Sequence, residues 1–279
     1  MMKAESDLSR SNGALRGGKS AAAALLGSSS FRYALGALIL GGLWSFFSRL
    51  LGPEILPDPV EACKGFILSL ADPDFLHHGA ISIARLMGGL ALATVTGFPL
   101  GLWFGHSAKA DWLGAPLTFI TFPVPKIVLL PVFFTIVGIG DASRVLLIAL
   151  TAGYQILVIV RAEALALDPS YALAFRSMGG RGAALWRHVY VPAALPSLFT
   201  SLRVAVGTAV AVLFLAESFA TDAGLGWLIM DAWGMGDVLR MFTGIIALSV
   251  LGVALYAGVT LLERLFSPWL RVHGKPTGA

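Results

Sequence analysis

The sequence predicts an all-α integral membrane protein that crosses the bilayer about six times. Of its 279 residues, 57% are hydrophobic and only 13% are charged, and the mean hydropathy is +0.80. Soluble domains contain about 45–50% apolar and about 25% charged residues, so this chain has too few charges to cover a surface in water. The composition excludes a soluble globular enzyme and a disordered binding protein.

Six apolar stretches have the length that a hydrocarbon core of about 30 Å requires, which is roughly 20 helical residues. The third stretch contains Pro123, Pro125 and Pro131, which predict a bent or broken helix because proline lacks a backbone donor. The predicted spans are Tyr33–Leu51, Ile81–Phe104, Leu117–Val137, Ser143–Val160, Ser197–Ala216 and Phe242–Leu262.

The basic residues predict the orientation of these spans. Six crossings place both termini on one side, and the tails and loops of that side carry 13 Lys and Arg residues. The loops of the other side carry four, which are Arg49, Lys64, Arg144 and Arg240. Because cytoplasmic loops retain basic residues, we expect both termini in the cytoplasm.

Two polar tails flank the predicted membrane domain, which covers residues 32–270. Residues 1–31 are rich in Ser, Gly, Ala and Arg, so we expect a disordered cytoplasmic tail there and a second short tail at residues 271–279. The first span is not a cleaved signal sequence, because it follows a long polar tail and no small-x-small cleavage site comes after it.

Other short patterns in the chain do not indicate catalysis or cofactor binding. Residues Gly13–Ser20 match the G-x-x-x-x-G-K-S pattern, but a phosphate-binding loop needs a preceding strand in a parallel sheet, which this tail does not offer. The single Cys63 excludes an intrachain disulfide, and the five histidines form no metal-ligand cluster. A net charge of +4 is too weak to predict nucleic-acid binding. We expect no metal, no cofactor and no enzymatic chemistry in this chain.

The longest predicted cytoplasmic loop, residues 161–196, reads as a helix–turn–helix. Asp168 and Pro169 are typical of a helix start, and the first helix covers Ser170–Met178. Gly179 and Gly180 break it, and a second helix over Arg181–Tyr190 is predicted to end at the prolines that follow, Pro192 and Pro196. Such a pair is either a lever moved by a cytoplasmic partner or an amphipathic anchor of the loop at the membrane surface.

Two parts of this loop, Phe175–Gly179 and Trp186–Pro196, have the sequences FRSMG and WRHVYVPAALP. They resemble the cytoplasmic "EAA" coupling loop of ABC-importer permeases, and most closely that of the nitrate/sulfonate/taurine class. Other motifs support the resemblance in order and spacing over residues 50–265. These are Leu56–Pro59, Ser82–Arg85 with Gly89, Gly97–Gly101, Pro123–Pro131 with Gly138–Asp141, Ala216–Glu217, and Gly224–Ile229.

The resemblance implies a type I ABC-importer permease in the bacterial cytoplasmic (inner) membrane. It implies a second copy of the permease, two ATP-binding subunits that hold ATP and Mg, and an extracytoplasmic solute-binding protein. It also implies that the coupling loop docks on the ATPase, through residues Leu173, Ala174, Phe175, Arg176, Gly179, Gly180 and Pro192. One departure stands out: Leu173, Ala174 and Phe175 occupy the places of Glu and two Ala in the family pattern.

Four charged residues lie in or near the spans, where a charge at the bilayer centre costs at least about 2.5–3.5 kcal/mol. Lys126 follows Pro123 and Pro125, where an opened backbone favours a cavity, so it is a candidate to line the path of an anionic solute, with snorkelling as the alternative. Arg85 is a second path candidate, although its place near a span end also allows snorkelling to headgroups. Glu217 is predicted to pair with Arg85 or Arg203.

Gly97, Gly101 and Gly105 form a stripe of small residues along one helix face, which allows another backbone to approach closely. The stripe predicts either packing within the chain or a seam between two copies.

Together these features predict the membrane-spanning permease subunit of an ATP-driven importer for a small, anionic solute of the sulfonate, nitrate or taurine kind. The alternative is a secondary transporter driven by an ion gradient, which predicts internal repeats and paired intramembrane acids. The sequence shows no repeat between residues 33–137 and 143–262.

Overall fold

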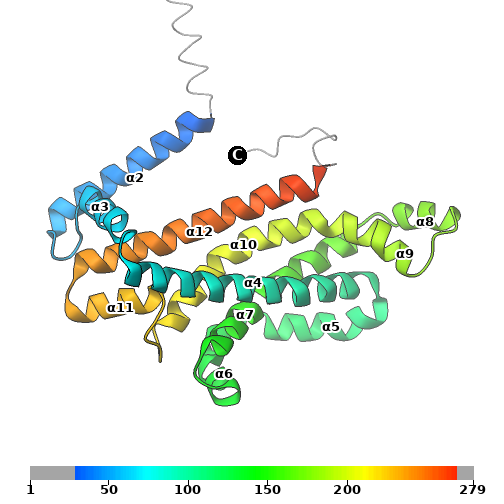
Figure 1. The fold of residues 1–279 in the computed structure, drawn as a ribbon. Helices are drawn as coiled ribbons and strands as arrows, with labels where there is room; N and C mark the ends of the chain where they lie inside the picture. The colour runs from blue at the N-terminus through cyan, green and yellow to red at the C-terminus, as the bar shows by residue number, and fades with distance from the viewer. Residues whose placement is uncertain (1–28, 269–279) are drawn as a thin grey trace, which may run out of the picture. The chain divides into compact units, whose positions relative to one another are not determined.

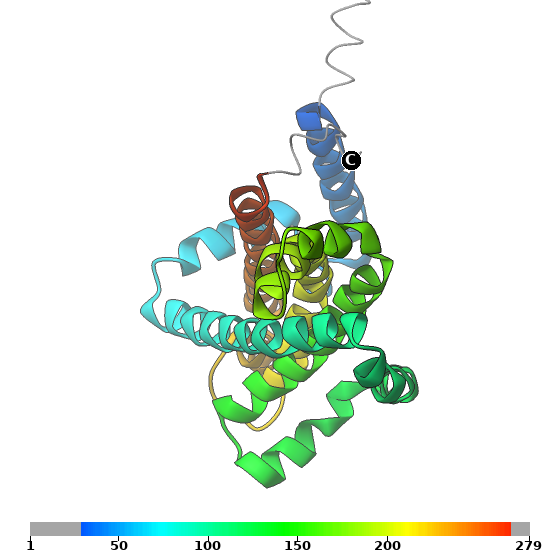
Figure 2. The same cartoon turned by 90° about the vertical axis from the view of Figure 1, so that its right-hand side faces the viewer.

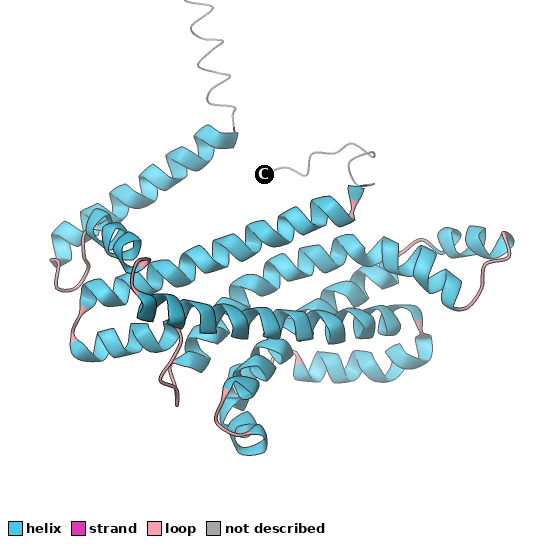
Figure 3. Ribbon diagram, in the orientation of Figure 1, coloured by secondary structure: helices cyan, strands magenta, loops and turns pink. Residues whose placement is uncertain are grey.

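The computed structural model describes residues 29–268, and every regular element in that range is a helix (Figure 3). Residues 1–28, including Gly13–Ser20, and residues 269–279 lie outside the described range, whereas residues 29–31 of the predicted N-terminal tail belong to the first helix. The chain divides into two compact units, residues 1–63 and 64–279, and each is described by itself.

In the first unit, α2 (Ser29–Leu51) is long and apolar enough to cross a membrane. Most of its side chains are exposed, as a helix surrounded by lipid requires. The chain after α2 folds back on its last turns, where Trp44 Nε1 donates to the carbonyl of Pro57 at 3.0 Å and Ser48 Oγ to that of Leu56 at 2.9 Å. The next helix, α3 (Pro59–Ser69), begins in this unit and ends in the second.

The second unit contains the remaining helices. They are α4 (Pro73–His106), α5 (Ala108–Thr121), the 3₁₀ turn η1 (Lys126–Leu129), α6 (Leu130–Val137), α7 (Asp141–Ala166), α8 (Pro169–Ser177), α9 (Ala183–Leu185), the π turn η2 (Trp186–Tyr190), α10 (Val191–Glu217), α11 (Leu225–Met235) and α12 (Val238–Phe266). In the described part of the chain, five helices have the length and composition of a span, and six do if one bent pair counts as a span. This confirms the predicted all-α membrane fold.

The predicted third span is the bent pair, in which residues 108–121 and 126–137 meet at 91°. Figures 1 and 2 show α6 turned aside from α5. Because Pro125 has no N–H, the carbonyl of Thr121 lacks the donor four residues on that a continuous helix would supply, and it accepts from the N–H of Val124 at 3.2 Å instead. Lys126 Nζ donates to the carbonyls of Thr121 at 2.9 Å and Phe122 at 2.7 Å.

The glycine stripe packs α4 against α7 of the same chain. A Cβ at Gly97 would lie 2.5 Å from the carbonyl oxygen of Gly153, and one at Gly101 would lie 2.8 Å from that of Leu157. Near the end of α4, a Cβ at Gly105 would lie 2.4 Å from the Cβ of Ala164. Of the two interpretations of the stripe, the structure therefore shows packing within the chain.

These contacts also fix the direction of the helices. Residues early in α4 meet residues early in α7, so the two helices run parallel, and the bent pair between them must return to the side where α4 began. The next helix, α10, runs antiparallel to both, since its last residue, Glu217, lies beside Arg85 near the start of α4. The last helix, α12, runs antiparallel to α10, because Phe266 stacks on Phe199 with ring centroids 6.4 Å apart. The helices of the second unit therefore have two opposite ends, which we name after the short helix that lies at each: the α8 end and the α11 end (Figure 1).

We expect Gly97→Ala to destabilise the protein by about 1–3 kcal/mol, because the added methyl group overlaps backbone and forces α4 away from α7. The midpoint of thermal unfolding in detergent, followed by tryptophan fluorescence, measures the effect. The matched control is Gly258→Ala in α12, where a Cβ meets nothing within 4 Å. An equal response of both variants would contradict the close approach of α4 and α7.

Candidate functional site

A cluster of buried charges joins three helices at the α11 end. Arg85 of α4 is 5% exposed, and Glu217 at the end of α10 is fully buried. Arg85 Nη1 donates to Glu217 Oε1 at 2.8 Å and to the carbonyl of Ala223 at 2.8 Å. On its other side, Nε and Nη2 of Arg85 lie 2.7 and 2.6 Å from a single oxygen, Oδ1 of Asp141.

Glu217 is fully satisfied by hydrogen bonds, which is the condition for burying a carboxylate. Besides Arg85, it accepts from Ser82 Oγ at 2.9 and 2.8 Å and from the backbone N–H of Gly226 at 2.9 Å. Gly224 and Gly226 make the space, because a Cβ at either position would lie 2.4–2.7 Å from the Glu217 side chain. Ser82 Oγ also accepts from the N–H of Leu225 at 2.8 Å. The carboxylate therefore holds α4, α10 and the start of α11 together.

The alternative that Arg85 snorkels to the headgroups is wrong. The helix begins at Pro73 and not near Ile81, because Asp72 caps it by accepting from the N–H of Asp74. Arg85 therefore lies three turns inside α4 and pairs with Glu217. The other predicted partner of Glu217, Arg203, instead forms an ion pair with Glu263 of α12.

A second buried arginine, Arg144, was counted as a loop cation in the sequence. It lies in the first turn of α7 and is 2% exposed. Its Nε donates to the carbonyl of Ala216 at 3.1 Å, and its Nη2 donates to those of Phe219 at 3.0 Å and Ala220 at 2.5 Å. These are carbonyls at and just beyond the end of α10, where a cation is favoured. The sequence signal that could have identified it is an arginine directly inside an apolar span.

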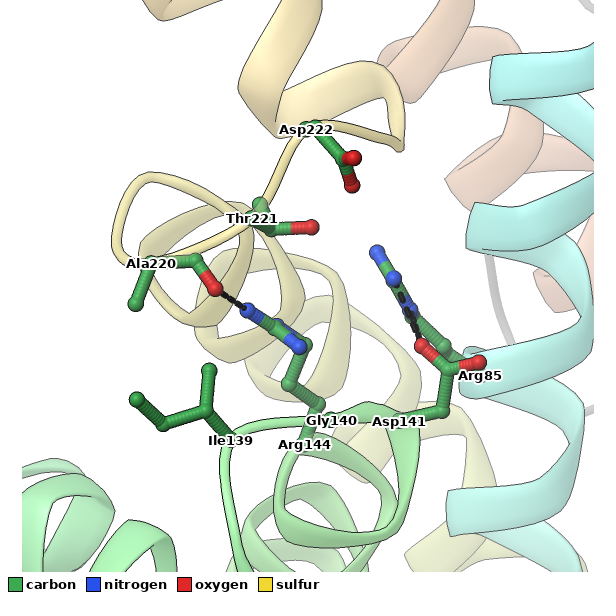
Figure 4. A pocket seen from close by; sticks show the side chains of 8 residues that line it. All are labelled: Arg85, Ile139, Gly140, Asp141, Arg144, Ala220, Thr221 and Asp222. Carbon is green, nitrogen blue, oxygen red and sulfur yellow. Dashed lines mark hydrogen bonds and ion pairs between the residues drawn. The ribbon is translucent and has the colours of Figure 1, made fainter.

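Both arginines border a hollow of about 470 Å³ at the α11 end. Its lining comes from Arg85 of α4, from the start of α7 with the two residues before it, and from the segment after α10 (Figure 4). The lining residues are Arg85, Ile139, Gly140, Asp141, Arg144, Ala220, Thr221 and Asp222. The hollow therefore presents guanidinium groups and carboxylates to one small space.

The other predicted path residues, Lys126, Pro123 and Pro125, lie at the bend between α5 and α6. Besides its two hydrogen bonds to carbonyls, the Lys126 ammonium lies 4.3 Å from the ring centroid of Tyr154. These contacts explain why a cation is tolerated at a broken membrane helix. A role of Lys126 in the solute path remains a prediction.

At the α8 end, the predicted coupling residues form an exposed helix followed by a tight turn. Asp168 caps α8 by accepting from the N–H of Ser170 at 2.8 Å, and this backbone hydrogen bond lowers the pKa of the Asp168 carboxyl. Leu173, Ala174 and Arg176 are exposed on α8, and Phe175 is half-buried. Gly179 has φ +88°, a backbone conformation that favours glycine.

The Phe175 side chain packs against this turn at Gly180. A Cβ at Gly180 would lie only 2.0 Å from the Phe175 ring, so the glycine provides the space that the ring fills. On its other side, the ring stacks on His188 of η2 with centroids 5.9 Å apart. The aromatic residue at a position where the family pattern has alanine is thus matched by the second glycine of the turn.

The prediction that Pro192 and Pro196 end the second helix is wrong. The helix continues from α9 through η2 into α10, and Pro196 lies inside α10. Pro192 has no N–H to continue the regular ladder, and the turn before it widens so that the N–H of Val191 donates to the carbonyl of Trp186, five residues back. The helical rod from Ala183 to Glu217 is therefore continuous.

The contacts at the start of this rod join it to the end of α4. The His106 ring stacks on the Tyr190 ring with centroids 3.7 Å apart, and it also packs edge-on against Trp186. Arg181, Arg187 and His188 of the same segment are exposed.

The fold and these two regions define a class: a multi-pass helical membrane protein with a buried charge cluster at one end and an exposed helical element at the other. No group of three or more His, Cys, Asp or Glu residues in the described part of the chain could hold a metal ion.

Comparison with known proteins identifies the family. Residues 97–272 match the family described as binding-protein-dependent transport system inner membrane component, and the chain belongs to this family. The family is a permease component of ABC transporters and not a catalytic enzyme.

Relatives agree with this assignment, and a solved structure agrees with the fold. The chain is 28% identical over 246 residues to the taurine transport system permease protein TauC of Escherichia coli (strain K12), which covers 86% of this chain and 88% of that protein. It is 29% identical over 233 residues to the formylaminopyrimidine transport permease protein ThiX of Halalkalibacterium halodurans, covering 83% and 93%. An inward-facing structure of the MetNI methionine ABC transporter shares the fold, with a TM-score of 0.59 at 20% identity over 68% of this chain and 95% of that one.

We expect Arg85→Met to destabilise the protein by about 3–5 kcal/mol, because it leaves the buried Glu217 carboxylate without its cation. The double variant Arg85→Met/Glu217→Gln is expected to lose less than the sum of the two single variants, since no uncompensated charge remains. Thermal unfolding of the four proteins measures this coupling. Arg240→Met, which removes a half-exposed partner 4.0 Å from Asp231, is the control and is expected to change little. Additive effects at Arg85 and Glu217 would contradict the coupling.

Proposed function

We propose that the chain is the translocation subunit of an ATP-driven importer for a small, anionic solute of the sulfonate, nitrate or taurine kind. It works as a homodimer with two ATP-binding subunits and receives solute from an extracytoplasmic binding protein. ATP and Mg are held by the partner ATPases, and this chain contributes no cofactor. The family membership and the substrate named for the taurine relative support this proposal.

We place the α8 end in the cytoplasm of a bacterial cell, with both termini on that side of the cytoplasmic membrane. The distribution of Lys and Arg supports this orientation. The hollow between Arg85 and Arg144 then opens toward the outside, where solute arrives.

The observation that carries the coupling mechanism is α8 itself, a short helix that is exposed yet held in a fixed shape. Its exposed face, with Leu173 and Ala174, docks on the ATPase, while Phe175 and Gly180 hold the turn below it. When ATP closes the ATPase pair, α8 moves with it, and the continuous rod from Ala183 to Glu217 transmits the motion to the α11 end. The free energy that shifts the equilibrium between inward-open and outward-open states comes from nucleotide bound to the partner.

The docking surface is tested with Ala174→Glu, which places a charge on the exposed face of α8. Co-purification of the cognate ATPase with the tagged permease is expected to fall at least about tenfold, since an unpaired charge in an interface costs more than 1.4 kcal/mol. The matched control is Ala108→Glu, an exposed alanine at the start of α5 at the same end of the bundle. Undiminished recovery of the ATPase with Ala174→Glu would overturn the docking of the ATPase on this face of α8.

The brace of the turn is tested with Gly180→Ala, whose methyl group overlaps the Phe175 ring. We expect it to uncouple transport, so that ATP hydrolysis no longer responds to the binding protein in proteoliposomes. Adding Phe175→Ala removes the clash and is expected to restore the response, because it vacates the space that the new methyl group needs. Failure of this rescue in a folded double variant would show that Gly180 acts by another means than by accommodating Phe175.

A further inference from the structure

In the hollow at the α11 end, the Nε and Nη2 edge of the Arg85 guanidinium is occupied by the exposed side chain of Asp141. Nε and Nη2 of Arg85 form the planar fork that normally binds two oxygens of an oxyanion. In the structure this fork contacts one oxygen of Asp141, whose side chain is 68% exposed. Glu217, by contrast, is buried and holds Arg85 from the other side. Of the two carboxylates that contact Arg85, Asp141 is therefore the one that a bound oxyanion could replace.

The second guanidinium in the hollow is not paired with a carboxylate in the described part of the chain. Arg144 uses Nε and Nη2 to donate to three backbone carbonyls, and no residue between 29 and 268 accepts from its Nη1. The adjacent start of α7 adds to the positive potential, because Gly140 provides no side-chain cap for the first N–H groups of this helix. The base of the hollow is thus suited to an oxyanion.

The hollow is lined by acids as well. Asp222 is exposed and has no ion-pair partner within residues 29–268, and Asp141 contributes a second carboxylate. A plain anion at the two arginines would be repelled by these acids, whereas a molecule that also carries a cation would bind both signs (Figure 4). The volume of about 470 Å³ accommodates a solute of a few heavy atoms.

We propose that this hollow is a binding subsite for a small zwitterion with an oxyanion head and an ammonium group a few bonds away. The oxyanion replaces Asp141 on the fork of Arg85 and accepts from Nη1 of Arg144, while the ammonium is held by Asp222 and the released Asp141. The inference rests on the proposed function and assigns the selection of solute charge to Arg85 and Arg144. Lys126 is the weaker candidate for that role, because its ammonium already donates to two carbonyls.

The test uses the full-length chain with its ATPase subunits in lipid nanodiscs, without the binding protein. Saturation-transfer NMR titrations compare two probes: taurine, a zwitterionic sulfonate, and ethanesulfonate, which has the same head without the ammonium. We expect taurine to bind about fivefold more tightly than ethanesulfonate, the upper value for one exposed charge pair.

Two variants separate the roles of the acids. Asp222→Asn is expected to remove most of the preference for taurine. Asp141→Asn frees the fork of Arg85 and is expected to raise the affinity for ethanesulfonate about fivefold, the opposite of what loss of a purely structural ion pair would do. Asp74→Asn, an exposed acid in the first turn of α4 that does not line the hollow, is the matched control and is expected to change neither probe.

Absence of binding by both probes would overturn the inference, and so would equal binding that none of the variants alters. The same nanodiscs report on the proposed function independently, because the ATPase either remains bound to the permease or does not. If the ATPase stays bound but taurine shows no preference over ethanesulfonate, the proposed subsite is contradicted and the proposed function is not. Loss of the ATPase from the wild-type chain removes the proposed function itself.

Discussion

The arrangement at the α11 end depends on one buried ion pair, Arg85 with Glu217. Removing two charges from water costs several kcal/mol each, so the pair contributes specificity more than stability: Glu217 is tolerated only where Arg85, Ser82 and the N–H of Gly226 meet. These groups belong to three different helices. A slip of α10 along α4 by one turn would bury a carboxylate without partners, and the pair therefore fixes the register of both helices.

A second contact between the same two helices lies at the α8 end, where His106 of α4 stacks on Tyr190 just before α10. The two helices are thus joined near both ends, by charge at one and by aromatic rings at the other. The glycine stripe adds α7 to this frame through backbone contact, which leaves little freedom for sliding. These contacts hold α4, α7 and α10 together as one frame. The bent pair is joined to α7 as well, since Arg161 Nε lies 2.6 Å from Asp111 Oδ1 of α5 and Ser143 Oγ donates to the carbonyl of Phe133 in α6 at 3.2 Å.

Composition and segment length predicted the six apolar segments, because crossing a bilayer constrains length and apolar content. The prolines of the third segment predicted its break, because proline lacks a backbone donor. The sequence could not predict which charged residues form ion pairs. Arg85 and Glu217 are 132 residues apart, and the same pattern allowed Glu217 to pair with Arg203. Arg144 was assigned to a loop, because an arginine at a span boundary looks like a loop cation until the carbonyls at the end of α10 are placed beside it. The same limit applies to Phe175, whose fit depends on the turn that brings Gly180 under its ring.

The incorrect helix end at Pro192 has its physical reason in the turn that precedes this residue. A proline normally stops a helix because it lacks a donor and its ring crowds the carbonyl four residues back. Here the wide turn Trp186–Tyr190 removes the conflict, since its hydrogen bond reaches five residues back. A π turn is less tightly packed than an α-turn, and it lies between α9 and the rigid rod of α10. The same turn carries His188, which holds Phe175, and Tyr190, which holds His106. The π turn therefore connects the contacts of α8 with those of α4 at the point where the helix continues into α10.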